Sequence, residues 1–459
     1  MSQPSSHVSF AHLSSPSGLR FELNRNGSVR RILHDEVVIS LYTGTELDGG
    51  LCQIYLRQWE PDGIRFTPLL GPESPAAFTL TERGWVGLGF WHNIRVEIQL
   101  ILAQDSPVWF WHLRLENLGQ EPVRLDVLHT QDVGLSHYGN LRLNEYYVSQ
   151  YVDFSPFRHE PGGWVLTARQ NQPVAGRHPW LLLGALQQTN FATDALQFHG
   201  LAARHGRAPS LLCSGAELPN RRLQHEHALA VLGSPVLSLA AGDSTRQGFY
   251  ACFEADHPAA STSADLSRLQ SIRALPEAEP PDFPVLEGQP CVKTLFSPAR
   301  TLETLDLSEP ELTQHFGSDW QAVEREAGVL LSFFQGQRHV VLKAKEARVL
   351  RPHGHILRTG SGLLPDETAL TTTVWMSGIF NAMLTQGHVS INRIFSTTRS
   401  YLGLFPSHGQ RIFVELDQGY RLLATPSAFE MTPNACRWFY RWAEGLLVVS
   451  TTAGWEEPV

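Results

Sequence analysis

The strongest constraint on the fold is a two-residue periodicity of apolar side chains in three runs between positions 94 and 127, with one apolar face and one mixed face. Apolar residues occupy every second position from Ile94 to Leu102, with Arg95, Glu97 and Gln99 between them. Two further runs follow, and their apolar members are Trp109, Trp111, Leu113 and Leu115, then Val123, Leu125 and Val127. Successive side chains of a strand point to opposite faces, so each run predicts a strand with one buried face. We expect a three-strand antiparallel meander.

A tight hairpin is predicted nearer the N-terminus. Leu19, Phe21 and Leu23 alternate with polar residues, and apolar residues resume after the dipeptide Asn26-Gly27. Asn-Gly supplies the positive backbone angles of a two-residue β-turn. Because strand patterns of this kind recur to about residue 255, residues 1–270 are predicted to form one large antiparallel β-sandwich.

A change of composition marks the end of this first domain. Residues 255–290 are rich in proline and acidic side chains, which is typical of a connector. Ser308 with Glu311, and Ser318 with Gln321, then have the spacing of capping boxes. Gly317-Ser318 is expected to separate two short helices. The apolar residues predicted to share one face of these helices are Leu312, Phe316, Trp320, Val323 and Ala327.

The rest of the chain predicts a second domain of mixed character. Val340 to Leu342 indicate a strand, residues 412–416 alternate, Gly419 turns the chain back, and residues 394–405 have a helical pattern. We therefore expect a mainly β protein in three parts. These are the sandwich, residues 271–330 as connector and linker helices, and residues 331–459 as a smaller mixed β-rich module that looks truncated.

Composition excludes several classes of function. The net charge of −9 leaves no basic stripe for nucleic acid. The five cysteines form no CxxC pair, which argues against structural zinc and a disulfide framework. Neither a GxGxxG opening a helix nor a GxxxxGK[ST] motif occurs, so nucleotide binding is not expected. No signal peptide or membrane span is recognisable, and a cytoplasmic location is predicted by elimination.

The most polar segment of the chain runs from Gln131 to Asp153. Burying unpaired amides and carboxylates is costly, so a dense group of them indicates either a ligand surface or a satisfied network. Aromatic faces beside such groups suit a sugar ring, whereas a polar loop between strands is the plainer alternative. The residues concerned are Asn144, Glu145, Tyr146, Tyr147, Ser149, Gln150, Tyr151 and Asp153.

Three long segments resemble one known family. They are similar to the N-terminal part of the 1,2-β-oligoglucan phosphorylases. The segments are QDVG…LNEYYVSQYVD (Gln131 to Asp153), EARVLRPHGHILRTGSGLLPD (Glu346 to Asp366) and the region from Ser407 to Trp438. These enzymes are placed in glycoside hydrolase family 94 and are related to cellobiose phosphorylase. The segments occur in the family's order, and with the connecting regions the similarity covers nearly the whole chain.

The resemblance implies a fold and a function. The front of the chain is expected to be a supersandwich-type β domain, and the catalytic (α/α)6 barrel of the family is absent from this sequence. The complete enzyme would phosphorolyse β-1,2-glucooligosaccharides with inversion, giving α-glucose 1-phosphate. Inorganic phosphate is then the co-substrate and no cofactor is expected. Predicted partners are the oligosaccharide, a catalytic barrel domain or subunit, and a second copy in a homodimer. A stand-alone carbohydrate-binding protein or a scaffold subunit is the alternative.

No catalytic residue and no metal ligand is predicted in this chain, because the family's general acid lies outside the matched region. Contacts at the rim of a substrate site are expected from two groups of residues. They are Asn144, Glu145, Tyr146, Gln150 and Tyr151, and then Arg351, His353 and His355.

Other candidate residues have plainer interpretations. His225 with His227, and His353 with His355, have a spacing that places both imidazoles on one strand face, but a third metal ligand is not evident. The cationic group of Arg351, His353, His355 and Arg358 is either a phosphate or sugar contact or a network that ties loops together. No catalytic role is assigned to a further set of carboxylates, hydroxyls and indoles. The set comprises Glu145, Asp153, Asp366 and Glu367, then Ser149 and Ser407, and then Trp109, Trp111, Trp164 and Trp180.

Overall fold

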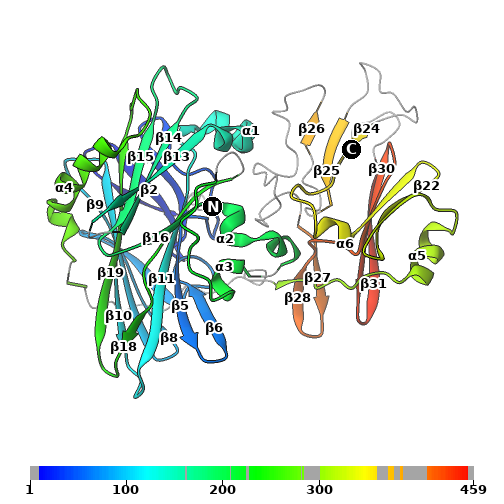
Figure 1. The fold of residues 1–459 in the computed structure, drawn as a ribbon, viewed down its shortest axis with the longest axis horizontal. Helices are drawn as coiled ribbons and strands as arrows, with labels where there is room; N and C mark the ends of the chain where they lie inside the picture. The colour runs from blue at the N-terminus through cyan, green and yellow to red at the C-terminus, as the bar shows by residue number, and fades with distance from the viewer. Residues whose placement is uncertain are drawn as a thin grey trace, which may run out of the picture. The chain divides into compact units, whose positions relative to one another are not determined.

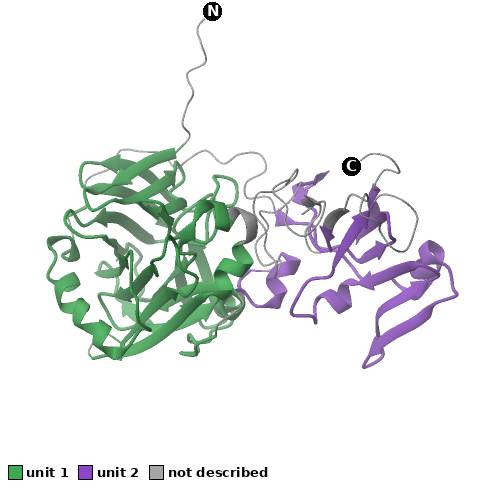
Figure 2. Cartoon of the chain, turned by 90° about the horizontal axis from the view of Figure 1, so that it is seen from above, with its two compact units in different colours: residues 1–198, 210–298 green, residues 199–209, 299–459 purple. Residues whose placement is uncertain are grey.

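The computed structural model describes residues 10–160, 163–206, 208–223, 227–280, 282–283, 300–358, 371–376, 383–385 and 411–452, with the side chains of residues 142–144, 371–373 and 383–385 left out. The chain divides into two units (Figure 2). Residues 1–198 and 210–298 form the N-terminal unit, and residues 199–209 and 299–459 form the C-terminal unit.

Two large antiparallel sheets build the N-terminal unit (Figure 1). One has eight strands in the order β13-β14-β15-β19-β10-β9-β8-β7, and the other has six, in the order β16-β17-β11-β5-β6 with β18 beside β11. The bounds are β5 Gln53–Glu60, β6 Gly63–Pro68, β7 Ala76–Thr81, β8 Gly84–Trp91, β9 Ile94–Leu102, β10 Val108–Asn117, β11 Val123–Asp132, β13 Val152–His159, β14 Gly163–Gln170, β15 Trp180–Ala185, β16 Asn190–Asp194, β17 Ala228–Gly233, β18 Leu237–Leu239 and β19 Ser244–Glu254.

One apolar core joins the two sheets. It contains Trp109 and Trp111 of β10 together with Ile54 of β5 and Val127 of β11, and each of these side chains is 0% exposed. Burial of apolar surface at about 25 cal/mol per Å² makes such a shared core the main source of stability. A core enclosed by two antiparallel sheets confirms the predicted mainly β fold with a large sandwich.

The predicted meander is right for two of its strands and wrong for the third. β9 and β10 pair antiparallel, with Leu100 opposite Trp111. The other neighbour of β10 is β19, however, and β11 lies in the six-stranded sheet beside β5. Alternation shows that a strand has one buried face, but it does not say which sheet supplies that face. Strands of both layers of a sandwich therefore give the same pattern.

A third sheet holds the predicted N-terminal hairpin. Its order is β1-β2-β3-β4-β12, with bounds β1 Phe10–Ser14, β2 Leu19–Asn24, β3 Val29–His34, β4 Val37–Val38 and β12 Ser136–His137. β2 and β3 pair across the Asn26-Gly27 turn, which confirms the hairpin. Gly27 has φ +82, and a Cβ there would lie 2.3 Å from the Phe78 ring, so the position requires glycine.

Short helices complete the N-terminal unit. Part of the predicted connector, helix α4, packs on the outward side of the eight-stranded sheet, where Leu269 and Ile272 join Phe110, Trp180 and Tyr250 in a second apolar cluster. The helices are α1 Tyr138–Gln150, α2 Ala195–His199, α3 Ser210–Cys213 and α4 Arg268–Arg273, with 3-10 turns η2 Ser263–Ser267 and η3 Pro276–Ala278. The 3-10 turn η1 Leu201–His205 belongs to the C-terminal unit.

The C-terminal unit is built on a six-stranded antiparallel sheet, in the order β21-β22-β23-β29-β30-β31. Two three-stranded sheets, β20-β28-β27 and β24-β25-β26, accompany it. The bounds are β20 Arg300–Thr301, α5 Glu309–Phe316, β21 Gln321–Glu326, β22 Val329–Gln335, β23 Arg338–Leu342, α6 Lys343–Glu346, β24 Gly354–Arg358, β25 Thr371–Trp375, β26 Met383–Thr385, β27 Phe413–Leu416, β28 Gly419–Leu422, β29 Ala428–Met431, β30 Ala435–Trp442 and β31 Gly445–Thr452.

Only the first of the two predicted linker helices forms. Helix α5 begins at the predicted capping box of Ser308 and Glu311. The second predicted helix is wrong, because β21 takes its place and pairs with β22. Ala327 and Gly328 have φ +47 and +82, the backbone angles of a tight hairpin turn. Trp320, assigned to the helical stripe, stacks instead on Phe333 of β22 at 4.5 Å between ring centroids.

The remaining strand predictions in this unit are confirmed. Residues 340–342 lie in β23, and Gly419, with φ +95, turns the chain from β27 into β28. The helix predicted over residues 394–405 lies outside the described residues. In the described part of the chain, no helix has the length and apolar character that a membrane span requires.

Candidate functional site

The polar stretch of the N-terminal unit forms helix α1 and the strands that flank it. α1 follows β12 and leads directly into β13. The interpretation of this stretch as a loop between strands is therefore wrong, and the alternative of a polar network holds for its inward side. The Oγ of Ser149 accepts a hydrogen bond of 2.6 Å from the backbone N–H of Ala228, and Gln170 Nε2 donates to the carbonyl oxygens of Gly134 and Val148 at 2.9 and 3.2 Å. Ser149 is thus a structural hydroxyl.

A buried carboxylate fixes the loop that precedes this network. Asp132, at the end of β11, is 1% exposed, and its Oδ2 accepts from the N–H groups of Leu41 and Tyr42 at 2.8 Å each. Burial raises the pKa of Asp132 to about 6, and these two backbone donors act in the opposite direction. Such hydrogen bonds satisfy a buried acid without any ligand.

The predicted contacts of α1 separate into inward and outward side chains. Glu145 is 2% exposed, so it lies in the interior. Tyr146 and Gln150 are half-buried, and Tyr151 is 47% exposed. Asn144 belongs to α1, but its side chain lies outside the described part.

Sequence reasoning did not assign a contact to Tyr147, which is 53% exposed. It stands four residues before Tyr151, so the two phenol rings share one helix face. The four-residue spacing of the two tyrosines is visible in the sequence. It indicates a shared face only if the segment is a helix.

The other candidates of this unit are structural where the structure describes them. The backbone N–H of His227 donates to Asp194 Oδ2 at 2.9 Å, whereas His225 and Glu226 lie outside the described residues. Trp109, Trp111 and Trp180 are each 0% exposed, as expected for core residues. Trp164 is half-buried and its ring packs against Phe191, and Asp153 is half-buried on β13.

Neither a metal centre nor a disulfide is evident in the described ranges. No group of three His, Cys, Asp or Glu side chains there is arranged to hold a metal ion. Cys52, Cys213, Cys252 and Cys436 are free thiols, while Cys291, Asp366, Glu367 and Ser407 lie outside the description.

A buried acid and a histidine form the most organised polar pair of the C-terminal unit. Glu346, the last residue of α6, is 0% exposed. Its Oε2 lies 2.7 Å from Nδ1 of His353 and accepts from the backbone N–H of the same residue at 3.1 Å. Arg204 adds a compensating charge from η1, and its guanidinium donates to the carbonyl oxygens of Val349 and Leu350. The pKa of Arg204 is lowered by burial and raised in part by Glu346.

The other members of the predicted cationic group behave differently. His355 donates from Nε2 to the carbonyl oxygen of Thr432 at 2.7 Å, and burial lowers its pKa. Arg358 is 8% exposed, and its backbone N–H donates to the carbonyl oxygen of Pro433 at 3.2 Å. Arg351 is exposed. The structure therefore supports a role for His355 in a network that links loops. His353, in contrast, has a ring nitrogen, Nε2, that forms no hydrogen bond with a described residue.

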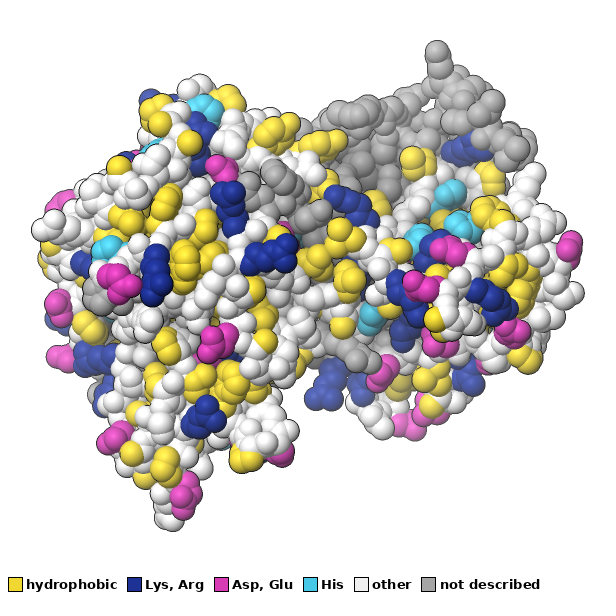
Figure 3. All heavy atoms as spheres, in the orientation of Figure 1, with side chains coloured by type: hydrophobic (Ala, Val, Ile, Leu, Met, Phe, Trp, Pro, Cys, Tyr) yellow, Lys and Arg dark blue, Asp and Glu magenta, His cyan; other side chains and the backbone are white. Residues whose placement is uncertain are grey.

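Further charged groups lie close to this pair. Lys345 forms an ion pair with Glu324 and is 3.2 Å from Ser332 Oγ. Burial and the positive charge of Lys345 lower the pKa of His339 to about 4, while Glu324 acts in the opposite direction. Figure 3 shows histidine side chains gathered among basic and acidic ones on one face of this unit.

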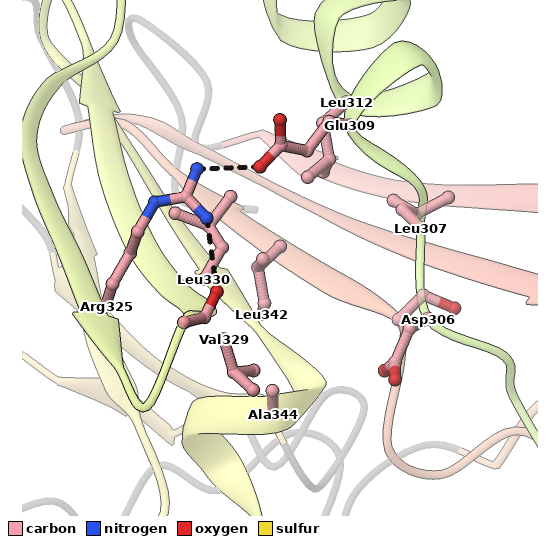
Figure 4. A pocket seen from close by; sticks show the side chains of 11 residues that line it. Asp306, Leu307, Glu309, Leu312, Arg325, Val329, Leu330, Leu342 and Ala344 are labelled. Atoms are coloured by element: carbon pink, nitrogen blue, oxygen red, sulfur yellow. Dashed lines mark hydrogen bonds and ion pairs between the residues drawn. The ribbon is translucent and has the colours of Figure 1, made fainter.

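A pocket of ≈ 210 Å³ lies elsewhere in the C-terminal unit (Figure 4). Its lining is mainly aliphatic, and Arg325 at its edge bonds to Glu309 at 2.7 Å. No residue of the lining has an aromatic ring, so the pocket lacks the stacking face that suits a sugar. The lining residues are Asp306, Leu307, Glu309, Leu312, Arg325, Gly328, Val329, Leu330, Leu342, Ala344 and Ser427.

The predicted site residues therefore belong to two separate groups. Those of α1 lie in the N-terminal unit, and Arg351, His353 and His355 lie in the C-terminal unit. Sequence reasoning missed Glu346, since nothing in a sequence distinguishes a buried acid from an exposed one. Among the described residues, the chemistry of these two groups includes hydrogen bonding by His353 and stacking by Tyr147 and Tyr151.

Comparison with known proteins gives two domain matches in sequence order. The profile described as SOGP N-terminal domain matches residues 22–251, and the profile described as glycoside phosphorylase supersandwich domain matches residues 319–459. A curated relative, the 1,2-beta-oligoglucan phosphorylase of Listeria innocua serovar 6a, is 30% identical over 426 residues. The aligned part is 91% of this chain but 37% of the relative, so the chain spans little more than a third of that protein.

Similar solved structures are more distant. A polysaccharide lyase is 14% identical with a TM-score of 0.35, over 52% of this chain and 33% of that protein. A protein described as a putative kojibiose phosphorylase from human microbiome is 8% identical with a TM-score of 0.27, over 58% of this chain and 28% of that protein. Scores of this size do not establish a shared fold.

Proposed function

We propose a function from the premise that this chain belongs to the family of proteins with an SOGP N-terminal domain, here followed by a glycoside phosphorylase supersandwich domain. The chain is the N-terminal, non-catalytic portion of an inverting glycoside phosphorylase that acts on β-1,2-glucooligosaccharides. The observation that carries the proposal is the similarity to a 1,2-beta-oligoglucan phosphorylase along 91% of this chain but over only 37% of that relative.

The proposed reaction needs groups from a catalytic (α/α)6 domain or subunit. A phosphate oxygen forms a bond to the anomeric carbon, the bond from that carbon to the glycosidic oxygen breaks, and a carboxylic acid protonates the departing oxygen. Inversion then gives α-glucose 1-phosphate. Inorganic phosphate is the co-substrate, and no cofactor takes part. We place the reaction in the cytoplasm and the chain in a homodimer.

The chain itself contributes a scaffold and saccharide contacts. The exposed rings are those of Tyr147, on α1, and Tyr151, the residue that follows α1, which are 53% and 47% exposed. An aromatic ring packs against the apolar face of a sugar, while nearby polar groups bond to its hydroxyls. In the C-terminal unit, Arg351 and His353 are the proposed polar contacts. The inward residues Glu145 and Ser149 support the fold.

A stand-alone carbohydrate-binding protein, or a scaffold subunit that joins a separately encoded barrel, is the second candidate. The exposed tyrosine pair favours saccharide binding in either case, because it does not depend on a catalytic domain.

Calorimetry on the 459-residue chain tests the proposed ligand. We expect submillimolar binding of sophorose, a β-1,2-linked disaccharide, and at least tenfold weaker binding of cellobiose, because a different linkage moves the second ring away from its contacts. Absence of heat with sophorose and with longer β-1,2-glucans would limit this chain to a scaffold. Equal affinity for both disaccharides would contradict the proposed linkage preference.

A further inference from the structure

A buried carboxylate receives both N–H groups of a single residue in the C-terminal unit. Glu346 Oε2 accepts from the backbone N–H of His353 at 3.1 Å and lies 2.7 Å from its Nδ1. A carboxylate oxygen is an acceptor, so Nδ1 is the donor of the second bond. Glu346 is 0% exposed, so bulk solvent does not reach its carboxylate. The geometry thereby fixes both the ring orientation and the location of its proton.

Charged groups close to the pair have opposite partners. Arg204 is 2% exposed, and its positive charge acts on the carboxylate of Glu346. Lys345 is likewise paired with Glu324. The carboxylate of Glu346 therefore has a buried counter-charge in addition to its bonds to His353.

The second nitrogen of His353 is left to accept a hydrogen bond. Its Nε2 has no hydrogen-bond partner among the described residues, and the side chain is 19% exposed. His355, two residues later, shows the contrasting arrangement, because its Nε2 is bonded to the carbonyl oxygen of Thr432. The two histidines therefore present different ring nitrogens as acceptors, Nε2 in His353 and Nδ1 in His355.

We infer that Glu346 is a positioning residue that holds His353 in the Nδ1–H tautomer, so that Nε2 accepts a hydrogen bond from a hydroxyl group of a saccharide. The inference rests on the proposed function for its ligand class. An acceptor nitrogen bonds to a hydroxyl donor, whereas the oxygens of a phosphate anion are themselves acceptors and do not complement it. Glu346 adds to the predicted contacts a residue that acts only through His353.

Nuclear magnetic resonance of the full chain with 15N-labelled histidine tests the tautomer directly. The His353 signals are identified by their loss in His353→Gln. We expect the pattern of a protonated Nδ1 in the wild-type chain and a reversal to protonated Nε2 in Glu346→Gln, since a glutamine amide can donate to Nδ1. Glu346→Asp keeps an acceptor and should retain the wild-type pattern in part. Glu311→Gln, a change at the cap of α5 in the same unit, should leave it unchanged.

Calorimetry with sophorose and with inorganic phosphate then tests the ligand. We expect Glu346→Gln to weaken sophorose binding about tenfold, because the reversed ring presents a donor where an acceptor is needed. A wild-type ring protonated at Nε2 would overturn the inference. So would a reversed tautomer with unchanged sophorose affinity, or phosphate binding that is stronger than sophorose binding.

The two proposals fail in different ways. If the wild-type chain shows the Nδ1–H tautomer but binds no sophorose, the saccharide is rejected as the ligand, and with it the hydroxyl part of the inference. If sophorose binds and only the tautomer is wrong, the proposed function stands and the role of Glu346 is rejected.

Discussion

The two polar segments of this protein are equally rich in hydrogen-bonding groups but use them differently. Around α1, Ser149 and Asp132 are bonded to backbone N–H groups, and the exposed side is left to tyrosine rings. Around α6, Glu346 bonds to a side chain, His353, whose other nitrogen remains an acceptor. The density of polar residues therefore does not distinguish a structural network from a binding site. The two are distinguished by whether each polar atom already has a hydrogen-bond partner within the protein.

The largest expected effect comes from removing the charge that balances Glu346. Arg204→Ala should lower the free energy of unfolding of the C-terminal unit by about 3–5 kcal/mol, because it leaves a buried carboxylate without its compensating charge. Adding Glu346→Gln should recover part of this loss, so that the two changes together cost less than their sum. Urea unfolding of the single and double variants measures both quantities.

Arg348→Ala is the matched control for this cycle. Its guanidinium pairs with Glu326 at the surface, with 40% and 63% of the two side chains exposed. A surface pair contributes about 0–1 kcal/mol. Equal losses in Arg204→Ala and Arg348→Ala would show that Glu346 does not depend on a buried counter-charge, and the contrast between the two segments would then weaken.

A smaller effect is expected from the acid of the N-terminal network. The pKa of Asp132 is raised by burial to about 6, above the value of about 3.9 for an unfolded chain. The native protein therefore holds more protons than the unfolded chain between these values, and the free energy of unfolding falls as pH rises through that window. Wild type should lose about 2 kcal/mol more than Asp132→Asn between about pH 4 and pH 7.

The measurement is urea unfolding at several pH values within that range. The amide oxygen of Asp132→Asn can still accept from Leu41 and Tyr42, so the variant should fold. Asp62→Asn, at an exposed turn, should follow the wild-type curve. Parallel curves for wild type and Asp132→Asn would mean that Asp132 is ionised in the native protein throughout, as in a functional carboxylate rather than in a neutral structural one.

The smallest expected effect concerns the exposed side of α1. Tyr147→Ala and Tyr151→Ala should each weaken sophorose binding about three- to tenfold, the size of one aromatic contact. Their stability should change by less than about 0.5 kcal/mol, because neither ring is buried. Tyr138→Ala is the control, since that ring is 45% exposed but packs against Arg31 at 5.0 Å. Equal losses of affinity in all three variants would remove the proposed role of this face.

Periodicity predicted the β architecture well, because burial on one side leaves a clear trace in the sequence. The strands β9 and β10 were placed within their bounds, and the Asn26-Gly27 hairpin was predicted from turn chemistry. The strand that pairs with β11 was not predicted correctly, because strand pairing depends on contacts between residues far apart in the chain. The false helix at residues 318–327 arose because spacings of three and four residues also occur by chance in a short β-hairpin.

The candidate sites were predicted less completely. The polar residues of α1 were found by their density, but the division into buried Glu145 and exposed Tyr147 needed the helix. His353 was predicted as a contact, while Glu346 was not, because its importance comes from complete burial beside His353. Sequence gives the types of side chain available, and the fold decides which of their atoms are already bonded.

The central claim is that this chain supports a phosphorylase reaction without performing it. The most direct test is release of phosphate from α-glucose 1-phosphate with sophorose as acceptor, using the purified 459-residue chain alone. We predict no release above the level of a heat-denatured sample. Sustained phosphate release that increases with the concentration of the chain would contradict the claim, because the catalytic groups would then lie within this chain.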